Sequence, residues 1–406
     1  MNLDQEVDYN LNTYAKKPKI IYLSYIRLTD RVSRTWFLDD LVSRGFDVEY
    51  WDLIPFMRDY HREYNEISPT YLKELNSLIE MEERINRQVK NVVYVLLFPL
   101  NNSTKKVYIK LSNLKVKIVY FDWGAMPIYK TSMQLTKFNR FAGTFRSLDY
   151  FKLVVQSKTI LLLQKFNVIK KFDVVFASGR FLVEKSRHAT KVVSIPFTDY
   201  IEYKKVEEKP RLETSKFVVF LDMNLPFQTD LALAGMPQIN PEMYYSELNS
   251  FFDMIETTFN VKVMIAAHPK TSLDSCYFGN RTVKRLKTAE LVRDAEFVIS
   301  HQSTSISYAV LNYKPIVFIY TQTMKSLYSS NVLNEIMKVA QYFGSDPINV
   351  NSESDLAGLV LPQIDREVYD RYIEEFIVSK SSQNSLPNEV FISEILSLVN
   401  SDGAQK

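Results

Sequence analysis

The sequence predicts an α/β protein of two domains, each built on a parallel β-sheet with flanking helices. Short runs rich in Val, Ile and Phe alternate with helical segments along most of the chain, which is typical of βαβ units. The length of 406 residues favours two domains over one. A charged stretch that contains Pro210, residues 203–214, has the composition of a linker. We therefore expect one domain on each side of it, at 18–202 and 215–380.

The composition is that of a globular protein, with 46% hydrophobic and 24% charged residues. The net charge of +3 gives no bulk charge that would favour a nucleic-acid partner. The single cysteine, Cys276, excludes an internal disulfide and fits a reducing compartment. The first residues lack the apolar core of a signal peptide, and no apolar run reaches the length of a membrane span. We expect a cytoplasmic protein, or one peripheral on the cytoplasmic face of the inner membrane.

The first domain follows a polar arm at residues 1–17. A helix is expected from Asp30, its cap, to Arg44, with Gly45 ending it. The turn before this helix carries no G-x-G-x-x-G sequence, so we expect no dinucleotide cofactor. The strands expected in this domain are residues 19–25, 46–52, 92–98, 115–121, 173–178 and 192–195.

Two groups of residues in this domain are candidates for the acceptor side of a site. Arg27, with Arg31 and Arg34, lies near the first turn and suits an anionic acceptor, although such arginines are commonly solvated helix residues. Asp122 ends a predicted strand before Trp123 and Gly124, where a carboxylate can serve as a general base. Alternatively, Asp122 caps a turn and Trp123 packs in the core.

Residues 129–171 are basic, with interleaved aromatic side chains. Such a segment suits contact with an anionic lipid surface or a lipid-linked acceptor. The alternative is an amphipathic helix with one core-facing stripe and one solvated face.

The second domain is expected to begin with a strand at 216–221 that ends before Asp222. The loop at 226–241 is long for a compact domain, and we expect it to face a cleft between the two domains. Asp222 and Asp230 are alternative candidates for the base or for acceptor binding, although loop aspartates commonly satisfy local turns. The helices expected in this domain and the tail, which spans 381–406, are 242–260, 288–294, 303–311, 331–343, 354–361, 365–379 and 388–400.

Polar residues follow two strands of this domain at their carboxyl ends, where open α/β sheets place ligand sites. The strand at 261–267 is followed by His268, Pro269 and Lys270, and the strand at 297–300 is followed by His301, Gln302, Ser303, Thr304 and Ser305. Hydroxyls and N–H groups at a helix start, a lysine charge and an imidazole all suit a phosphate. The alternative for the Ser-Thr-Ser run alone is a plain helix cap.

These motifs resemble the nucleotide-binding half of GT-B glycosyltransferases, above all the bacterial sialyl-, polysialyl- and Kdo-type transferases of capsule and lipopolysaccharide synthesis. His268-Pro269 matches the HP motif of those families and Ser303-Thr304 their S-S/T motif, both of which contact the phosphate of a CMP-sugar. Asp122 and Gly124 match the ends of their D/E-D/E-G motif, which supplies the base, but Trp123 departs from it.

The resemblance implies two Rossmann-like domains facing across a cleft, with the last helices returning to the first domain. It also implies an enzyme without a cofactor, because the donor is itself a substrate. We expect it to be metal-independent, since the sequence has no D-x-D in the setting that GT-A enzymes use, no H-E-x-x-H and no Cys/His cluster. That donor would be a CMP-activated acidic sugar, such as sialic acid, another nonulosonic acid or Kdo. The acceptor would be a glycan or lipid-linked glycan of a bacterial surface polysaccharide or lipopolysaccharide.

Several alternatives stay open at this point. The stretch SYAVLNYKPIVF, residues 307–318, resembles CDP-glycerol-type polymerases, so a phosphotransferase of that type is one. An NDP-hexose glycosyltransferase would use the same phosphate site. A UDP-sugar 2-epimerase has a similar fold but needs more acid and base groups than the sequence places. A scaffold of polysaccharide assembly would keep the fold without activity.

Overall fold

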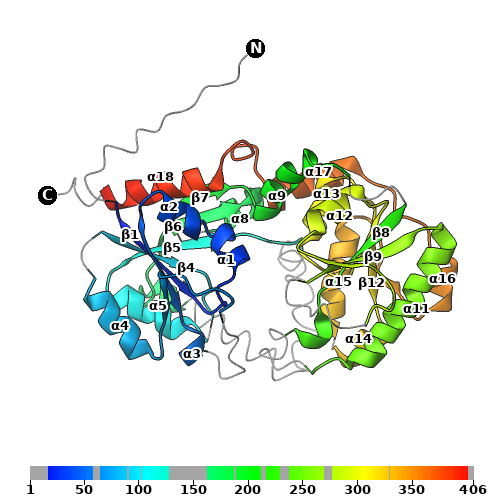
Figure 1. Ribbon diagram of the computed structural model, residues 1–406, viewed down its shortest axis with the longest axis horizontal. Helices are drawn as coiled ribbons and strands as arrows, with labels where there is room; N and C mark the ends of the chain where they lie inside the picture. Colours follow the sequence, from blue (N-terminus) through cyan, green and yellow to red (C-terminus); the bar gives the residue numbers. More distant parts are fainter. Residues whose placement is uncertain are drawn as a thin grey trace, which may run out of the picture.

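The computed structural model describes ten stretches of the chain, which are residues 17–57, 65–88, 91–101, 103–127, 162–186, 189–211, 216–228, 237–268, 277–328 and 330–400. They form two α/β domains that lie side by side (Figure 1). The predicted roles of Asp230, Pro269 and Lys270 fall outside the described residues, as do Cys276 and most of the basic segment 129–171.

The N-terminal domain contains a seven-stranded sheet in the order β3-β2-β1-β4-β5-β6-β7, and every described strand pair is parallel. The strands are β1 (Lys19–Ser24), β2 (Asp47–Asp52), β3 (Leu72–Glu74), β4 (Val92–Leu96), β5 (Lys117–Asp122), β6 (Phe172–Ser178) and β7 (Ala189–Ile195). The six predicted strands are confirmed. Strand β3 was not predicted, because its three residues, two half-buried and one exposed, give no apolar pattern.

Side chains of β1 alternate between two cores. Ile21 and Leu23 pack in one, and Ile20 and Tyr22 in the other. Because both faces are buried, helices cover both. The helices of this domain and of its connection to the next are α1 (Asp30–Thr35), α2 (Leu38–Ser43), α3 (Ile54–Met57), α4 (Leu78–Asn86), α5 (Lys105–Asn113), α8 (Gly179–Lys185) and α9 (Thr198–Glu207).

The single helix predicted from Asp30 to Arg44 is wrong in one respect, because the structure contains two helices there. Phe37 has a left-handed φ of 63°, which ends α1 and starts α2. The cap also differs from the prediction, since the side chain of Thr29 accepts the backbone N–H of Val32 at 3.1 Å.

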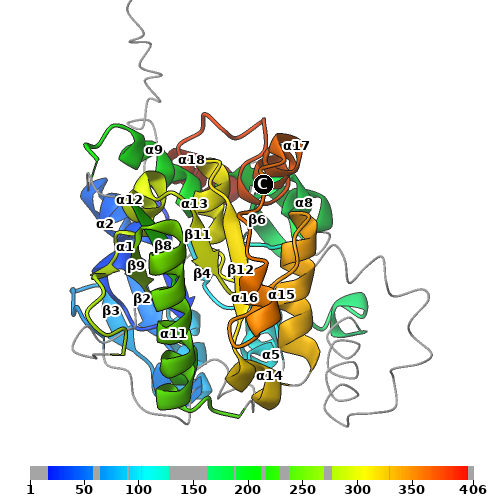
Figure 2. The ribbon, with the colours of Figure 1, turned by 90° about the vertical axis from the view of Figure 1, so that its right-hand side faces the viewer.

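The C-terminal domain has a six-stranded sheet in the order β10-β9-β8-β11-β12-β13, again with only parallel pairs among those described. Its strands are β8 (Phe217–Leu221), β9 (Lys262–Ala267), β10 (Val283–Arg285), β11 (Val298–Ser300), β12 (Ile316–Tyr320) and β13 (Ile348–Asn349). Its helices are η2 (Leu225–Phe227), α11 (Pro241–Phe259), α12 (Thr288–Asp294), α13 (Ile306–Leu311), α14 (Gln322–Leu327), α15 (Ser330–Tyr342), α16 (Glu353–Ala357) and α17 (Arg366–Tyr372). Figure 2 shows α11 and α15 on opposite faces of the sheet.

Each sheet reverses its strand order once. In the C-terminal domain the chain runs from β8 outward to β9 and β10, then returns to β11 on the other side of β8. In the N-terminal domain the same reversal lies between β1 and β4. The crevice at such a reversal is where open α/β sheets bind ligands.

The predicted linker 203–214 overlaps α9, so residues 203–207 are helical. The end of α9 is fixed to the C-terminal domain by Arg293 of α12, whose guanidinium donates to the carbonyl oxygens of Lys209 at 2.7 Å and Pro210 at 2.9 Å. The described part of the linker is therefore docked rather than free.

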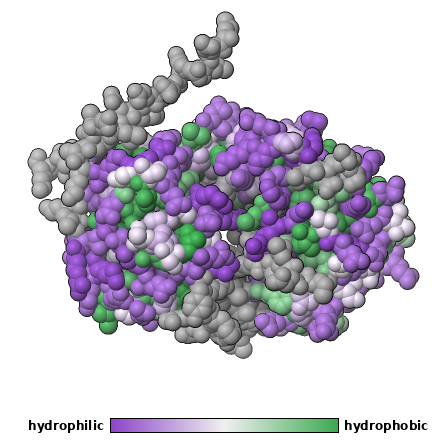
Figure 3. Space-filling view, in the orientation of Figure 1, coloured by the Kyte–Doolittle hydropathy of each residue, from purple (hydrophilic) through white to green (hydrophobic). Residues whose placement is uncertain are grey.

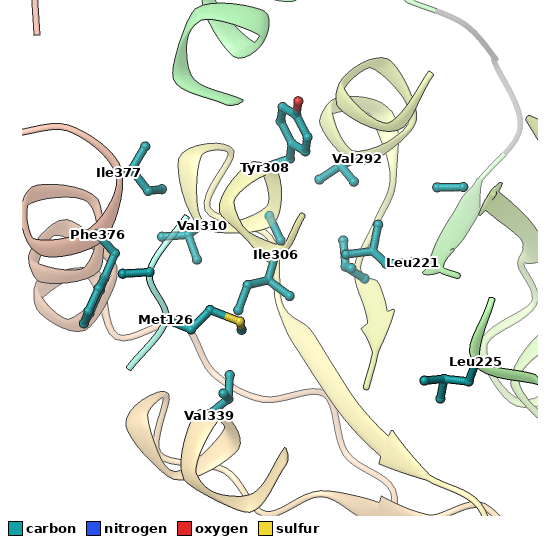
Figure 4. Packing of buried hydrophobic residues seen from close by; sticks show 14 of the residues in the cluster. Met126, Leu221, Leu225, Val292, Ile306, Tyr308, Val310, Val339, Phe376 and Ile377 are labelled. Carbon is teal, nitrogen blue, oxygen red and sulfur yellow. The ribbon is translucent and has the colours of Figure 1, made fainter. Parts of the chain in front are cut away.

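The chain returns to the N-terminal domain at its end, as the resemblance implies. A π-helical segment η3 (Ile373–Ile377) packs on α8, and α18 (Pro387–Asn400) lies along the N-terminal domain (Figure 1). The segment after β5 also joins the two domains. Figure 4 shows Met126 of the N-terminal domain among Ile306, Val310 and Val339 of the C-terminal domain. One apolar core therefore runs through both.

Candidate functional site

A cleft of about 1110 Å³ lies between the two domains. Its N-terminal wall is formed by α1 and α2, and α9 contributes where the domains join. Its C-terminal wall is formed by the residues that follow β8, β9 and β11 and by the start of α12. Figure 3 shows hydrophilic residues bordering the hollow where the two domains meet. The walls thus combine the carboxyl ends of strands from one sheet with helices that follow strands of the other.

The register of the C-terminal sheet brings the predicted phosphate residues to one edge. Leu221, the last residue of β8, pairs with Ala266 of β9 and with Ser300 of β11. The segments after these three strands therefore leave the sheet together. Of them, Asp222, His268 and residues 302–305 line the cleft. They flank the reversal of strand order between β8 and β11.

Residues 303–305 form a tight turn that starts α13. The backbone N–H of Ile306 donates to the carbonyl of Ser303 at 3.1 Å, and the Ser303 hydroxyl accepts the N–H of Ser305 at 3.2 Å. Helix α13 itself begins at Ile306, three residues later than predicted. Ser303, Thr304 and Ser305 all retain exposed surface in the cleft. Their hydroxyls can therefore donate to the oxygens of an anion.

Gln302 lies between this turn and α15. Its side-chain nitrogen donates to Glu335 at 3.1 Å, while its side-chain oxygen is buried without a partner among the described residues. One end of the amide is therefore fixed, and the whole residue borders the cleft.

His301 is placed differently from the prediction that it contacts a phosphate. Its side chain is fully buried, and it is not among the described residues that line the cleft. Nδ1 lies 2.7 Å from the carbonyl oxygen of Ile319, and Nε2 lies 2.8 Å from the hydroxyl of Tyr244. A carbonyl only accepts, so Nδ1 carries the proton and Nε2 accepts from Tyr244. Burial lowers the pKa of His301 to about 4, against the opposing effect of the Ile319 hydrogen bond. The imidazole is thus neutral and joins α11 to the sheet.

Asp222 directly follows β8 and is buried in the cleft wall. One carboxylate oxygen accepts the backbone N–H of Asn224 at 2.8 Å, which closes a local turn. The residue thus has the structural role expected of a loop aspartate, and it also borders the cleft.

The Asp122-Trp123-Gly124 segment is not part of the described cleft lining. Asp122 ends β5 and accepts a hydrogen bond from the Ser186 hydroxyl at 3.3 Å. The ring of Trp123 lies 4.6 Å from that of Trp36. Gly124 has a φ of +76°, and a Cβ there would lie 3.5 Å from Phe197. These contacts match the alternative in which Trp123 packs in the core.

The three arginines near the first turn take different positions. Arg27 forms an ion pair with Glu66 at 2.9 Å and does not line the described cleft. Arg31 and Arg34 of α1 are exposed and do line it. Arg31 and Arg34 are therefore better candidates than Arg27 for the predicted acceptor role.

Asp199 in the first turn of α9 is a cleft residue that the sequence reasoning missed. It is buried and accepts hydrogen bonds from Ser307 and, at 3.1 Å, from the hydroxyl of Tyr308. Burial raises the pKa of Asp199 to about 6, although these bonds and the charge of Arg31 oppose the rise. The sequence could have revealed the helix that carries Asp199, because an acidic first turn and Lys204-Lys205 in the last turn are typical of a helix.

The described residues contain neither a metal-binding cluster nor a membrane-spanning helix. No group of three His, Cys, Asp or Glu side chains there could hold a metal ion. None of the described helices is long and apolar enough to cross a bilayer.

The comparisons with known proteins come from structure alone, since the sequence matches no protein-family model and no curated protein sequence. The calicheamicin glycosyltransferase CalG4 superposes with a TM-score of 0.52 at 12% identity, over 95% of this chain and 99% of that one. A variant of the wall teichoic acid polymerase TagF gives a TM-score of 0.51 at 10% identity, over 96% of this chain and 90% of that one. These two likenesses, together with the two parallel sheets and the C-terminal helix that returns to the first domain, confirm the GT-B fold.

Proposed function

We propose that the protein is a glycosyltransferase that takes a sugar from a nucleotide-sugar donor. The observation that carries this proposal is the position of His268 and residues 303–305. They line an interdomain cleft at the strand reversal of a GT-B C-terminal domain. The likeness to CalG4, named as a glycosyltransferase, supports the same activity class.

In this proposal the donor phosphate lies against the Ser303–Ser305 turn. The hydroxyls of the turn donate to the phosphate oxygens, and His268 adds a further donor from the end of β9. Donors fixed in place before the reaction stabilise the negative charge that develops on the departing nucleotide. His301 supports the site only indirectly, by holding the segment that precedes the turn.

The donor that we propose is a CMP-activated acidic sugar, because His268-Pro269 and Ser303-Thr304 match the two motifs of CMP-sugar transferases. The acceptor would then be a glycan or lipid-linked glycan of a bacterial surface polymer. The base at Asp122 remains a prediction from the same resemblance. Asp222 is the alternative that borders the described cleft.

A second candidate is a phosphotransferase of the CDP-glycerol type. Two observations favour it, namely the likeness to the polymerase TagF and the resemblance of residues 307–318 to such polymerases. Both candidates place a cytidine nucleotide in the same cleft. Both release CMP, but the donor of the phosphotransferase carries two phosphates, whereas a CMP-sugar carries one, so CDP resembles the first donor and CMP the second.

The first test is thermal stabilisation of the protein by CMP, CDP, UDP and GDP, each added without metal and again with Mg²⁺. A ligand that binds only the folded state stabilises it by about 2.7 kcal/mol at a hundredfold excess over its Kd. We expect CMP to give the largest shift. A larger shift with CDP would favour the phosphotransferase, and one with UDP or GDP would move the donor to an NDP-hexose. No shift with any nucleotide would overturn the proposed function.

The second test is His268→Ala. We expect at least a tenfold loss of nucleotide affinity, or about 1.4 kcal/mol, because a hydrogen-bond donor to the phosphate is removed. Calorimetric titration with the best nucleotide measures it. Lys262→Ala is the matched control, since Lys262 is exposed at the opposite end of the same strand. Equal affinity in His268→Ala and Lys262→Ala would remove His268 from the site.

A further inference from the structure

The N-terminal wall of the cleft carries two arginines that the proposed donor site does not use. Arg31 and Arg34 lie three residues apart on α1, so both side chains project from the same face of the helix. Both are exposed, and both line the cleft. Two positive charges therefore stand together on a surface that a substrate can reach.

The guanidinium of neither arginine forms a hydrogen bond or an ion pair with another residue in the described part of the chain, although the charge of Arg31 acts on Asp199. The acidic residues of the described lining, in contrast, already have partners. These contacts are Asp39 with Tyr71, Asp40 with Arg44, Asp199 with Ser307 and Tyr308, Glu202 with Lys205, Asp222 with the Asn224 N–H, and Glu290 with Lys209 and Lys287. The guanidinium N–H groups of the arginine pair are therefore available to a ligand.

The position of the pair in the fold also points to a ligand. Helix α1 follows β1, and β1 borders the strand-order reversal of the N-terminal sheet. This is the crevice in which open α/β sheets bind ligands. The Ser303–Ser305 turn belongs to the other wall of the same cleft. A substrate held by the arginines would therefore face the proposed donor phosphate from the opposite domain.

We propose that Arg31 and Arg34 form a subsite for a negatively charged group of the acceptor, an inference that rests on the proposed glycosyltransferase function. A guanidinium pairs with a carboxylate or a phosphate through two parallel N–H···O bonds, which suits either anion. An acceptor such as an acidic glycan or a phosphate-bearing polyol meets this requirement. A neutral glycan would leave two cleft arginines without an anionic partner.

The experiment measures binding of three probes by calorimetric titration. Trigalacturonate supplies carboxylates, its methyl ester is the neutral form, and glycerol 3-phosphate supplies a phosphate. The proteins are the wild type, the double variant Arg31→Gln/Arg34→Gln, and the control Arg27→Gln. Arg27 is matched because it comes from the same region but pairs with Glu66 outside the described lining.

We expect the wild type and Arg27→Gln to bind at least one of the anions and not the ester. The double variant should bind that anion at least tenfold more weakly, and rising NaCl should weaken the wild-type complex. The preferred probe distinguishes a carboxylate acceptor from a phosphate acceptor. Equal affinity in the double variant, binding of the ester as well as the acid, or no anion binding to the wild type would each overturn the subsite.

Nucleotide titration keeps this proposal separate from the proposed function. We expect the double variant to bind the best nucleotide as the wild type does, because the Ser303–Ser305 turn lies on the other domain. Competition between nucleotide and anion would place both in one subsite and overturn the acceptor assignment. Anion binding without any nucleotide binding would instead overturn the glycosyltransferase function and leave the arginine subsite standing.

Discussion

Two buried side chains near the cleft, Asp199 and His301, respond to pH in opposite directions. The pKa of Asp199 rises from its ordinary 3.8 to about 6, so its contribution to stability is present below pH 3.8 and is lost as pH rises through 6. The pKa of His301 falls from 6.5 to about 4, so its contribution is present above pH 6.5 and is lost as pH falls through 4. Between pH 4 and 6 the two effects oppose each other.

Asp199→Asn should therefore remove the contribution of Asp199 to the pH dependence of stability and leave that of His301. We expect the free energy of unfolding of the variant, relative to the wild type, to be higher at pH 7 than at pH 4.5. The difference should be on the order of 2 kcal/mol, since one pKa unit corresponds to about 1.4 kcal/mol. Urea unfolding at both pH values measures it. Glu208→Gln, an exposed position at the C-cap of the same helix, is the control. The same relative stability at both pH values would contradict the assignment of this titration to Asp199.

At the scale of elements, the contact between α8 and the π-helical segment η3 joins the two parts of the molecule. Gly179, the first residue of α8, has a φ of +68°, and a Cβ there would lie 2.4 Å from the carbonyl oxygen of Glu375. Arg180 adds an ion pair with Glu375 at 3.3 Å. The close backbone approach is possible only because residue 179 has no side chain.

A comparison of Gly179→Ala with Gly344→Ala should distinguish the cost of the steric contact with η3 from the cost of backbone strain alone. Gly344 has a similar φ of +71° with nothing within 4 Å of its Cβ position, so Gly344→Ala reports only the strain of about 1–2 kcal/mol. We expect Gly179→Ala to lose about 1–3 kcal/mol more, because η3 must move away. Denaturant unfolding of both variants measures the difference. Equal losses would show that η3 adjusts at no cost.

At the scale of the whole molecule, the last helix completes the core of the first domain. Phe391 of α18 is fully buried, and its ring lies 5.3 Å from Phe176 of β6 and 5.5 Å from Phe121 of β5. Ion pairs of Glu389 with Arg44 and of Glu394 with Lys191 border this contact. A stable N-terminal domain therefore depends on residues nearly two hundred positions beyond the predicted linker.

Phe391→Ala should lower the free energy of unfolding by about 3–5 kcal/mol, the usual cost of a large cavity in an aromatic core. Guanidinium unfolding measures it, with fluorescence and circular dichroism followed together. Leu386→Ala is the control, because Leu386 is 61% exposed in the same tail, and it should change stability by less than about 0.5 kcal/mol. A loss below about 1 kcal/mol for Phe391→Ala would mean that the tail is dispensable to the core.

The alternation of strands and helices, and the strand ends at which polar residues gather, could be predicted from the sequence alone. The helix expected at 288–294 matches α12 to the residue, and Asp222 and His268 directly follow β8 and β9 as predicted. These features follow from local periodicity and from the types of neighbouring residues. Short elements such as β3 and β13 carry too few residues to show a period, so they were not predicted.

Which of these polar side chains come together depends on tertiary packing. His268 and His301 both follow strands, yet one borders the cleft and the other is enclosed by α11 and β12. Arg27 pairs with Glu66, whereas Arg31 and Arg34 face the cleft. Sequence spacing fixes where a side chain lies along its own element. Whether that side chain reaches solvent depends on strand order and on helices that pack from distant parts of the chain.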